Sequence, residues 1–166
     1  MNIKYVKTNK NSIRLPRKYL PFADAEFVMK NLCAQAGLSD RFVIDSAAVS
    51  MEETGNDIYP PAQRKLREKG IPFTHRSARQ ITRADYDFYD HIICADSSNL
   101  RWIERLLGRD TEHKISLLME WVNGEKANIS DPWYTGDFEA AYRDIDLGCR
   151  ALLGKLTEGE QTVGCN

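Results

Sequence analysis

Two hydrophobic patterns alternate along this chain, one with the spacing of helices and one with the short apolar runs of buried strands. Apolar residues recur at helical spacing over residues 25–36, 61–69, 100–107 and 138–156. Short, mostly apolar runs stand between these segments, at residues 42–44, 91–95 and 115–119. This alternation predicts an α/β fold in which helices cover a parallel sheet.

Local signals indicate where several of these helices begin and end. Gly37, Gly70 and Gly108 directly follow three of the helical segments, and glycine is frequent just after the last turn of a helix. Thr82 stands where it can cap a further short helix that precedes the run at 91–95. Because no internal repeat, linker or low-complexity stretch interrupts the pattern, we expect one main domain.

Size and charge limit the classes of function. The chain has 166 residues, of which 42% are hydrophobic, and a net charge of −1, which suits a single domain with one core. A pI near 6.3 argues against binding to duplex nucleic acid, which usually requires a basic face. No apolar run is long enough to span a bilayer and no signal peptide is visible, so we expect a cytoplasmic protein without a membrane partner.

The four cysteines form no recognisable metal or disulfide pattern. Cys33, Cys94, Cys149 and Cys165 are widely spaced and include no Cys-x-x-Cys pair. We therefore interpret them as reduced thiols that mostly fill the core. Neither a metal nor another cofactor is expected.

Several short motifs resemble, in the same order, those of the low-molecular-weight protein tyrosine phosphatases. They are Ala36-Gly37-Leu38, Ile44-Asp45-Ser46-Ala47, the segments 62–71 and 75–82, and Asp131-Pro132-Trp133-Tyr134. Each motif alone is weak, whereas the ordered set is specific. The resemblance implies a four-stranded parallel sheet with helices on both faces and a site at the carboxyl edge of the sheet. It divides the chain into an aberrant basic segment at 1–24, a phosphatase-like domain at 25–157 and a polar tail at 158–166.

The resemblance also implies roles for five residues. Asp131 corresponds to the general acid that protonates the leaving phenolate, and Trp133 and Tyr134 to an aromatic wall beside the substrate ring. Ser46 and His75 correspond to residues that brace the phosphate-binding loop from behind. The implied substrate is a phosphotyrosine-containing protein or a small aryl phosphate, and the implied state is a monomer or weak dimer. Outside the family context, Asp131 and Ser46 would be ordinary turn residues, His75 would cap a helix, and Trp133 and Tyr134 would serve ordinary packing.

The phosphate-binding loop of that family is missing from the N-terminal part of the chain. The family begins with a strand that leads into Cys, five residues, Arg, and then Ser-Pro-Met-Ala-Glu. Residues 10–24 contain no cysteine and no glycine, and Pro16 and Pro21 lack the N–H donors that could hold a phosphate. We therefore expect Ile3 to Val6 to replace the lost central strand, with residues 8–21 as a long basic loop.

A shifted reading frame would account for the missing loop. With permitted codons for residues 11–24, reading one base later gives Ile-Leu-Phe-Val-Cys-Leu-Gly-Asn-Ile-Cys-Arg-Ser-Pro, and the last two bases begin an ATG codon. Ala25 and Glu26 then continue the family pattern in the present frame, as expected if one G was lost between ATG and GCG. A start codon for the shifted reading spans Tyr5 and Val6. The alternative is a genuinely divergent N-terminus.

The resemblance implies a low-molecular-weight protein tyrosine phosphatase, which works through a cysteinyl-phosphate intermediate, in a form that lacks its nucleophile and is inactive. Three alternatives stay open. The chain could be a non-catalytic module that binds phosphorylated proteins through Asp131, Trp133 and Tyr134, a relative of arsenate reductases, or a product that folds poorly. An arsenate reductase needs further redox cysteines after the third strand, where Cys94 stands alone.

Overall fold

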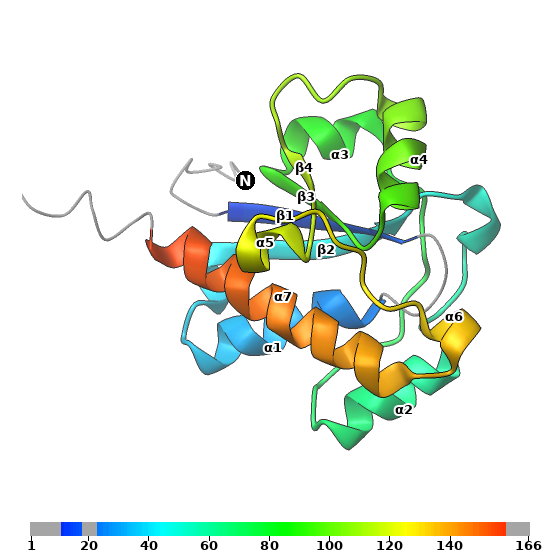
Figure 1. Ribbon diagram of the computed structural model, residues 1–166, viewed down its shortest axis with the longest axis vertical. Coiled ribbons are helices and arrows are strands. Elements are labelled where there is room, and N and C mark those ends of the chain that lie inside the picture. Colours follow the sequence, from blue (N-terminus) through cyan, green and yellow to red (C-terminus); the bar gives the residue numbers. More distant parts are fainter. Residues whose placement is uncertain (1–10, 18–22, 159–166) are drawn as a thin grey trace, which may run out of the picture.

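The structure is a computed structural model that describes the backbone of residues 11–17 and 23–158 (Figure 1). Side chains are described for residues 25–158, except those of Glu53, Trp133 and Tyr134. One sheet contains β1 (Asn11–Arg17), β2 (Phe42–Ala48), β3 (His91–Cys94) and β4 (Ile115–Leu117). The strands are ordered β2-β1-β3-β4 and each neighbouring pair is parallel, which confirms the predicted four-stranded parallel sheet.

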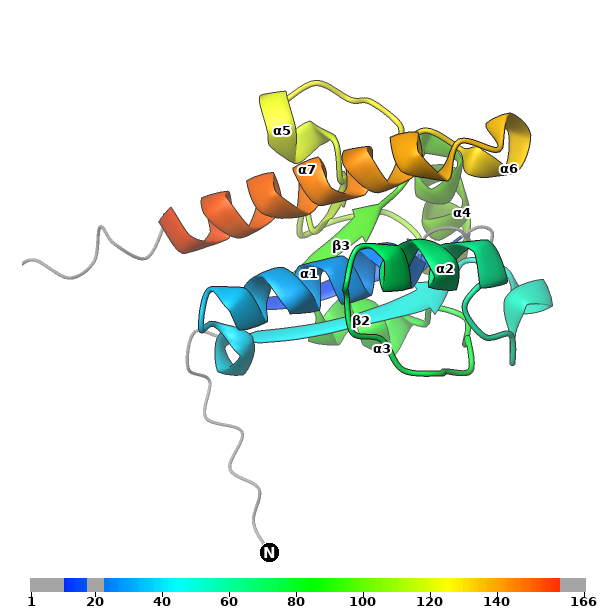
Figure 2. The same ribbon diagram turned by 90° about the horizontal axis from the view of Figure 1, so that it is seen from below.

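Helices cover both faces of this sheet, as Figures 1 and 2 show. One face carries α1 (Ala23–Gln35), α2 (Pro60–Glu68), the short α5 (Glu120–Asn123) and the long α7 (Phe138–Glu158). The other face carries α3 (Arg83–Phe88) and α4 (Ser97–Leu107). The one-turn helix α6 (Pro132–Thr135) precedes α7, and two 3-10 helices, Ser39–Arg41 and Met51–Glu53, flank β2. None of the helices in the described part of the chain has both the length and the apolar character that a bilayer crossing requires.

Two apolar layers hold the helices against the sheet. The larger lies on the side of α1, α2 and α7 and includes Met29 of α1 and Ile145 of α7. The smaller lies on the side of α3 and α4 and includes Tyr86, Ile92 and Ile103. Burial of each such side chain contributes roughly 1.5–3 kcal/mol, so both layers stabilise the sheet that lies between them.

Most elements lie where the hydrophobic pattern predicts them. The helices α1, α2, α4 and α7 and the strands β2, β3 and β4 each overlap a predicted segment. Thr82 caps α3 as expected: its Oγ1 accepts a hydrogen bond from Asp85 N at 3.4 Å, and the Asp85 carboxylate accepts one from Thr82 N at 2.7 Å. The pattern did not predict α5 and α6, because a helix of one turn is too short to show a period.

The expectation for the N-terminal region is wrong. Residues 11–17, expected to lie in a long loop, form β1 in the centre of the sheet, where they pair with β2 along their whole length. On the other side β1 pairs with β3 at Ile13 and Arg14. The backbone explains the difference, because β2 and β3 present N–H and C=O groups toward the gap between them and a strand satisfies both rows. The segment Ile3 to Val6 lies outside the described residues.

The long helix α7 packs closely at one glycine. Gly148 lies against the buried side chain of Leu118, and a Cβ added to this glycine would come within 2.5 Å of Leu118 Cγ. Gly154, further along the same helix, has no described atom within 4 Å of an added Cβ. Packing therefore requires the first glycine and not the second.

We predict opposite effects of alanine at these two glycines. Gly148→Ala should lower the free energy of unfolding by roughly 1–3 kcal/mol, because the new methyl group overpacks against Leu118. Gly154→Ala should raise it by roughly 0.5–1 kcal/mol, because alanine loses less backbone entropy in a helix. Urea unfolding followed by circular dichroism measures both changes. Effects of the same sign would contradict this packing account.

Candidate active site

The loop that carries Asp131 is anchored at the carboxyl edge of the sheet. Ile129 N donates to Ala95 O at 3.0 Å, which ties the loop to the residue after β3. Ser130 donates through its N–H and its hydroxyl to Asp144 Oδ2 on α7, at 2.9 and 2.8 Å. Asp131 therefore directly follows an anchored residue, at the edge where the parallel strands end.

Helix α6 begins immediately after Asp131 and leads the chain into α7. Thr135 N and Thr135 Oγ1 donate to Asp131 O at 3.4 and 3.1 Å. Pro132 is buried and occupies the first position of α6, where the fixed backbone angle of proline suits a helix. Trp133 and Tyr134 follow within α6, but their side chains are not among those described, so their role as an aromatic wall stays a prediction.

A buried group of charged and polar side chains lies where the carboxyl half of β2 meets the first turns of α1. Glu26 is 3% exposed and accepts hydrogen bonds from Ser46 Oγ at 2.8 Å and from Lys30 Nζ at 2.6 Å. The Arg76 guanidinium forms an ion pair with the same carboxylate and donates to Ser46 O at 3.0 Å. Asp45 Oδ1 lies 3.5 Å from Arg76 Nη2. We call Glu26, Ser46 and Arg76 the edge cluster.

His75 lies outside the edge cluster. Its side chain is 76% exposed, and its Nδ1 contacts the carboxylate of Asp57. Arg76, the next residue, is the one whose side chain reaches Ser46. This offset agrees with the extra residue between His75 and Ala78 relative to the family pattern His-x-Ala-Arg-Gln. The structure thus brings Ser46 to the edge cluster and leaves His75 at the surface.

The contact with His75 has an electrostatic consequence for Asp57. The hydrogen bond from His75 is the largest cause that lowers the pKa of Asp57 from its ordinary value of 3.8 to about 2. Asp57 Oδ1 also accepts the backbone N–H groups of Arg76 at 3.0 Å and of Ile58 at 2.7 Å, which act in the same direction. Asp57 therefore organises the segment that leads into the edge cluster.

The described thiols are poorly suited to nucleophilic chemistry. Cys33, Cys94 and Cys149 are each at most 1% exposed, which confirms their expected place in the core. Burial raises the pKa of the Cys33 thiol to about 11, and burial also raises the pKa values of Cys94 and Cys149. Cys94 ends β3 at the carboxyl edge of the sheet, yet it has no access to solvent. Cys165 lies outside the described residues.

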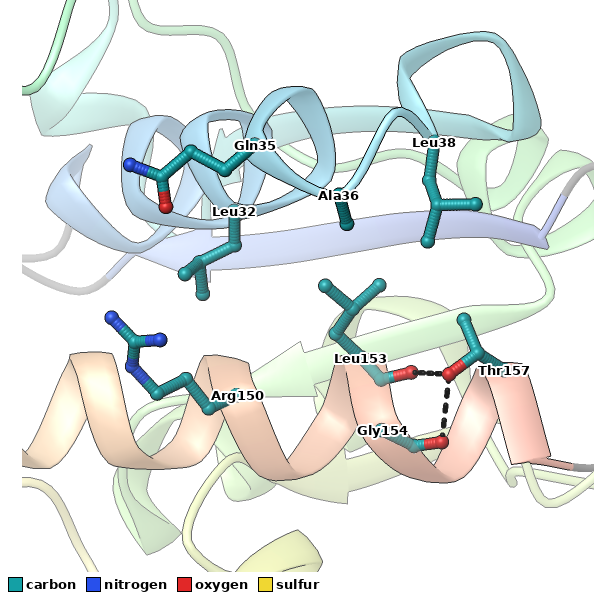
Figure 3. A pocket seen from close by; sticks show the side chains of 8 residues that line it. All are labelled: Leu32, Gln35, Ala36, Leu38, Arg150, Leu153, Gly154 and Thr157. Atoms are coloured by element: carbon teal, nitrogen blue, oxygen red, sulfur yellow. Dashed lines mark hydrogen bonds between the residues drawn. The ribbon is translucent and has the colours of Figure 1, made fainter.

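A groove of about 470 Å³ lies at the opposite end of the sheet, between the C-terminal halves of α1 and α7 (Figure 3). It is lined by Leu32, Gln35, Ala36, Leu38, Arg150, Leu153, Gly154 and Thr157. Two of its polar groups already have partners within α7: Thr157 Oγ1 lies 2.9 Å from Leu153 O, and Arg150 Nε lies 2.8 Å from Asp146 Oδ2. The lining of the groove does not include Asp131 or its neighbours in the loop.

The structure places at this edge several residues to which the sequence patterns assigned no role. The sequence patterns also indicated no metal site. No group of three or more His, Cys, Asp or Glu side chains that could hold a metal ion occurs in the part of the chain that the structure describes. Glu26, Arg76 and Asp144 received no role from the sequence. Glu26 had a signal, because it ends the family's Met-Ala-Glu motif. The contact of Asp144 with Ser130 depends on the loop folding back over α7, which sequence spacing does not encode.

We predict that the edge cluster makes a large contribution to stability through its ion pair. Arg76→Leu should lower the free energy of unfolding by about 3 kcal/mol, because it leaves the buried Glu26 carboxylate without its closest cation. Adding Glu26→Gln to this variant should recover much of the loss, since no buried charge then remains. Arg150→Leu is the control, because the exposed Arg150–Asp146 pair should contribute less than about 1 kcal/mol. Urea unfolding that gives equal losses for both arginines would contradict the prediction.

We also predict a pH dependence from the pair of His75 and Asp57. Because the folded-state pKa of Asp57 is depressed, the pair stabilises the fold above the ordinary pKa of 3.8, and this contribution is lost as the pH falls toward 2. His75→Ala should raise the Asp57 pKa, which NMR titration of its carboxyl carbon measures, and should remove less than about 1 kcal/mol because the pair is exposed. His113→Ala serves as the control, since His113 acts on Asp110. An unchanged Asp57 pKa in His75→Ala would refute the assignment.

Comparisons with known proteins bear on the identity of this framework. The sequence profile of the low molecular weight phosphotyrosine protein phosphatases matches residues 21–162. The low molecular weight phosphotyrosine protein phosphatase of Sus scrofa is 40% identical over 136 residues, which are 80% of this chain and 85% of that protein. The low molecular weight protein-tyrosine-phosphatase YfkJ of Bacillus subtilis is 33% identical over 138 residues, which are 82% of this chain and 88% of that protein.

Solved structures agree with the sequence comparisons. The crystal structure of YfkJ from Bacillus subtilis is similar to this chain with a TM-score of 0.85 and 28% identity, and the match covers 93% of this chain and 99% of that chain. The crystal structure of SP-PTP, a low molecular weight protein tyrosine phosphatase from Streptococcus pyogenes, gives a TM-score of 0.77 and 31% identity over 89% and 93% of the two chains. The chain belongs to the low molecular weight phosphotyrosine protein phosphatase family.

Proposed function

We propose that this chain is a low molecular weight protein tyrosine phosphatase that keeps the framework of the enzyme and, in its present sequence, lacks the nucleophile. Its substrate class is a phosphotyrosine-containing protein or a small aryl phosphate, in keeping with the names of the pig and Bacillus relatives. The proposal that the present chain is inactive rests on one observation. No cysteine anywhere in the sequence is followed six positions later by an arginine.

The chemistry explains why this absence is decisive. A cysteine thiolate attacks phosphorus, the bond from phosphorus to the aryl oxygen breaks, and Asp131 gives its proton to the leaving phenolate. Water then attacks the phosphorus of the cysteinyl phosphate, the sulfur–phosphorus bond breaks, and Asp131 takes up the proton of the water. This second step releases phosphate and restores the thiolate. Asp131 serves only the proton transfers, so neither step begins without a thiolate.

The thiols that are present offer no substitute. A reactive cysteine needs a depressed pKa, which backbone N–H groups at a helix N-terminus or a nearby cation provide. Cys33, Cys94 and Cys149 have raised pKa values and are buried, so they are protonated at neutral pH and closed to a substrate.

The framework nevertheless supports the family's reaction. The acid loop is held by the contacts of Ile129 and Ser130, so Asp131 stays presented at the carboxyl edge of the sheet. The edge cluster supplies buried hydrogen-bonding groups behind the same edge. Active sites of open parallel α/β sheets lie at this edge, so a nucleophile placed there would complete the site.

We predict that the purified chain has no phosphatase activity. Loss of the nucleophile from a set of residues that act together removes nearly all of the rate. The chain should hydrolyse p-nitrophenyl phosphate no faster than a buffer control at mildly acidic and at neutral pH, with YfkJ assayed in parallel as the positive control. Hydrolysis that iodoacetamide abolishes would overturn the proposal. Serine variants at the four cysteines would then identify the nucleophile.

A further inference from the structure

The strand β1 occupies the most enclosed position in the sheet. It lies between β2 and β3, with one apolar layer on each face. The neighbouring residues Phe42, Ile44, Ile92 and Ile93 are all buried. Strands in such a setting are normally continuous apolar runs. The residues of β1, Asn11–Arg17, include two arginines, an asparagine and a proline and do not form such a run.

Pro16 is the clearest conflict between the residues and the position. Proline has no N–H group to donate to a neighbouring strand, so within sheets it is confined to edge strands, first positions and bulges. Here Pro16 stands opposite Ala47 in the continuous β1–β2 pairing of a central strand. The backbone therefore fits a different set of side chains from the one that the present sequence supplies.

We propose that this backbone belongs to the reading one base later, in which β1 is an apolar strand that ends at the nucleophile of an active phosphatase. In that reading, permitted codons for residues 11–14 give Ile-Leu-Phe-Val, four apolar residues that suit a strand between two apolar layers. The cysteine of the loop falls at the position of Leu15. That the restored loop would be catalytically active rests on the proposed function. The choice of reading frame is argued from the fold alone.

The start of α1 supplies an independent match. This helix begins at Ala23. With permitted codons, the shifted reading allows serine at the position of Phe22 and proline at the position of Ala23. Serine is a preferred residue just before a helix, and proline is preferred at its first position. The present Phe22 has no side-chain atom that could cap the helix. This agreement lies outside β1, so the fit of the strand does not produce it.

The strand pairing connects the shifted cysteine with the edge cluster. Leu15 pairs with Ser46 across β1 and β2, and Ser46 donates to Glu26 in the second turn of α1. A thiolate at the position of Leu15 would thus leave the strand beside Ser46, ahead of the N-terminus of α1. Backbone N–H groups at such a terminus stabilise a thiolate and bind phosphate oxygens. The edge cluster would then lie behind the loop that carries this thiolate.

Sequence and structural similarity end at different places. The family profile begins at residue 21. The structural match to YfkJ covers 93% of this chain, which is more than residues 21–166 alone can supply. Similarity of the backbone therefore continues upstream of the point where similarity of the residues stops. A change of reading frame produces this combination, because it changes every residue and leaves the length of chain before α1 intact.

Chance agreement is limited by the genetic code. In most shifted codons the first and third bases are fixed by the present residues and only the middle base is free. Arg14 followed by Leu15 allows only Val, Ala, Asp or Gly in the shifted reading, and Phe22 followed by Ala23 allows only Leu or Ser. The apolar strand, the cysteine and the Ser-Pro helix start all fall within these narrow choices.

The test combines DNA with protein. Sequencing the genomic DNA that encodes residues 5–25 should show middle bases that spell Ile-Leu-Phe-Val-Cys. One base is then inserted before the codon of Ala25, with translation from the ATG that spans Tyr5 and Val6. A matched control carries the same insertion with the shifted cysteine codon, at the position of Leu15, changed to serine. Both proteins are compared with the present chain by urea unfolding and by hydrolysis of p-nitrophenyl phosphate.

If the shifted reading is correct, both inserted forms should unfold at a urea midpoint higher than that of the present chain by roughly 1 M or more, because they regain an apolar central strand. Only the form with the cysteine should hydrolyse the substrate. In that form Asp131→Asn should lower kcat by about 100- to 10,000-fold, whereas Asp137→Asn, which alters the cap of α7, should leave it nearly unchanged.

The outcomes separate the two proposals. Middle bases that spell other residues, or an unchanged urea midpoint, would overturn the shifted frame. A higher midpoint in both inserted forms without hydrolysis would support the frame and overturn the proposed function. Hydrolysis that is indifferent to Asp131→Asn would show that a different group is the general acid.

Discussion

The gap between β2 and β3 is the constraint on which the rest of this structure depends. Both strands present backbone N–H and C=O groups to that gap, and helices on both faces keep water away, so the groups require a partner within the chain. β1 supplies the partner along the whole of β2 and at two positions of β3. Its place in turn determines where α1 begins and brings Glu26 against the carboxyl half of β2.

The rest of the candidate site is held independently of this N-terminal strand. Asp131 is positioned by hydrogen bonds among Ala95, Ile129, Ser130 and Asp144, all of which follow β3 in the chain. The hydrogen bonds that hold the Asp131 loop therefore involve none of the first two dozen residues. Under the proposed function, the loop that carries Asp131 keeps its position although residues 1–24 supply no cysteine.

The edge cluster shows how a buried charge is tolerated beside a site. An isolated carboxylate at 3% exposure would be expensive to bury. Glu26 is instead surrounded by Arg76, Lys30 and the hydroxyl of Ser46, which neutralise its charge and satisfy its oxygens. Arg76 also donates to the backbone of β2, so the cluster links the strand, the helix and the segment before α3. Removing one partner disturbs all three elements.

The sequence by itself determined the fold class, the family motifs from Ala36 to Tyr134 and the helix signals at Gly37 and Thr82, because periodicity and capping are local properties of the chain. Tertiary structure alone decided that residues 11–17 form the central strand, against their own propensity. The backbone N–H and C=O groups that require this strand belong to β2 and β3, which lie far along the chain. It also decided that Arg76, and not His75, reaches Ser46, because the path of a loop depends on what it packs against.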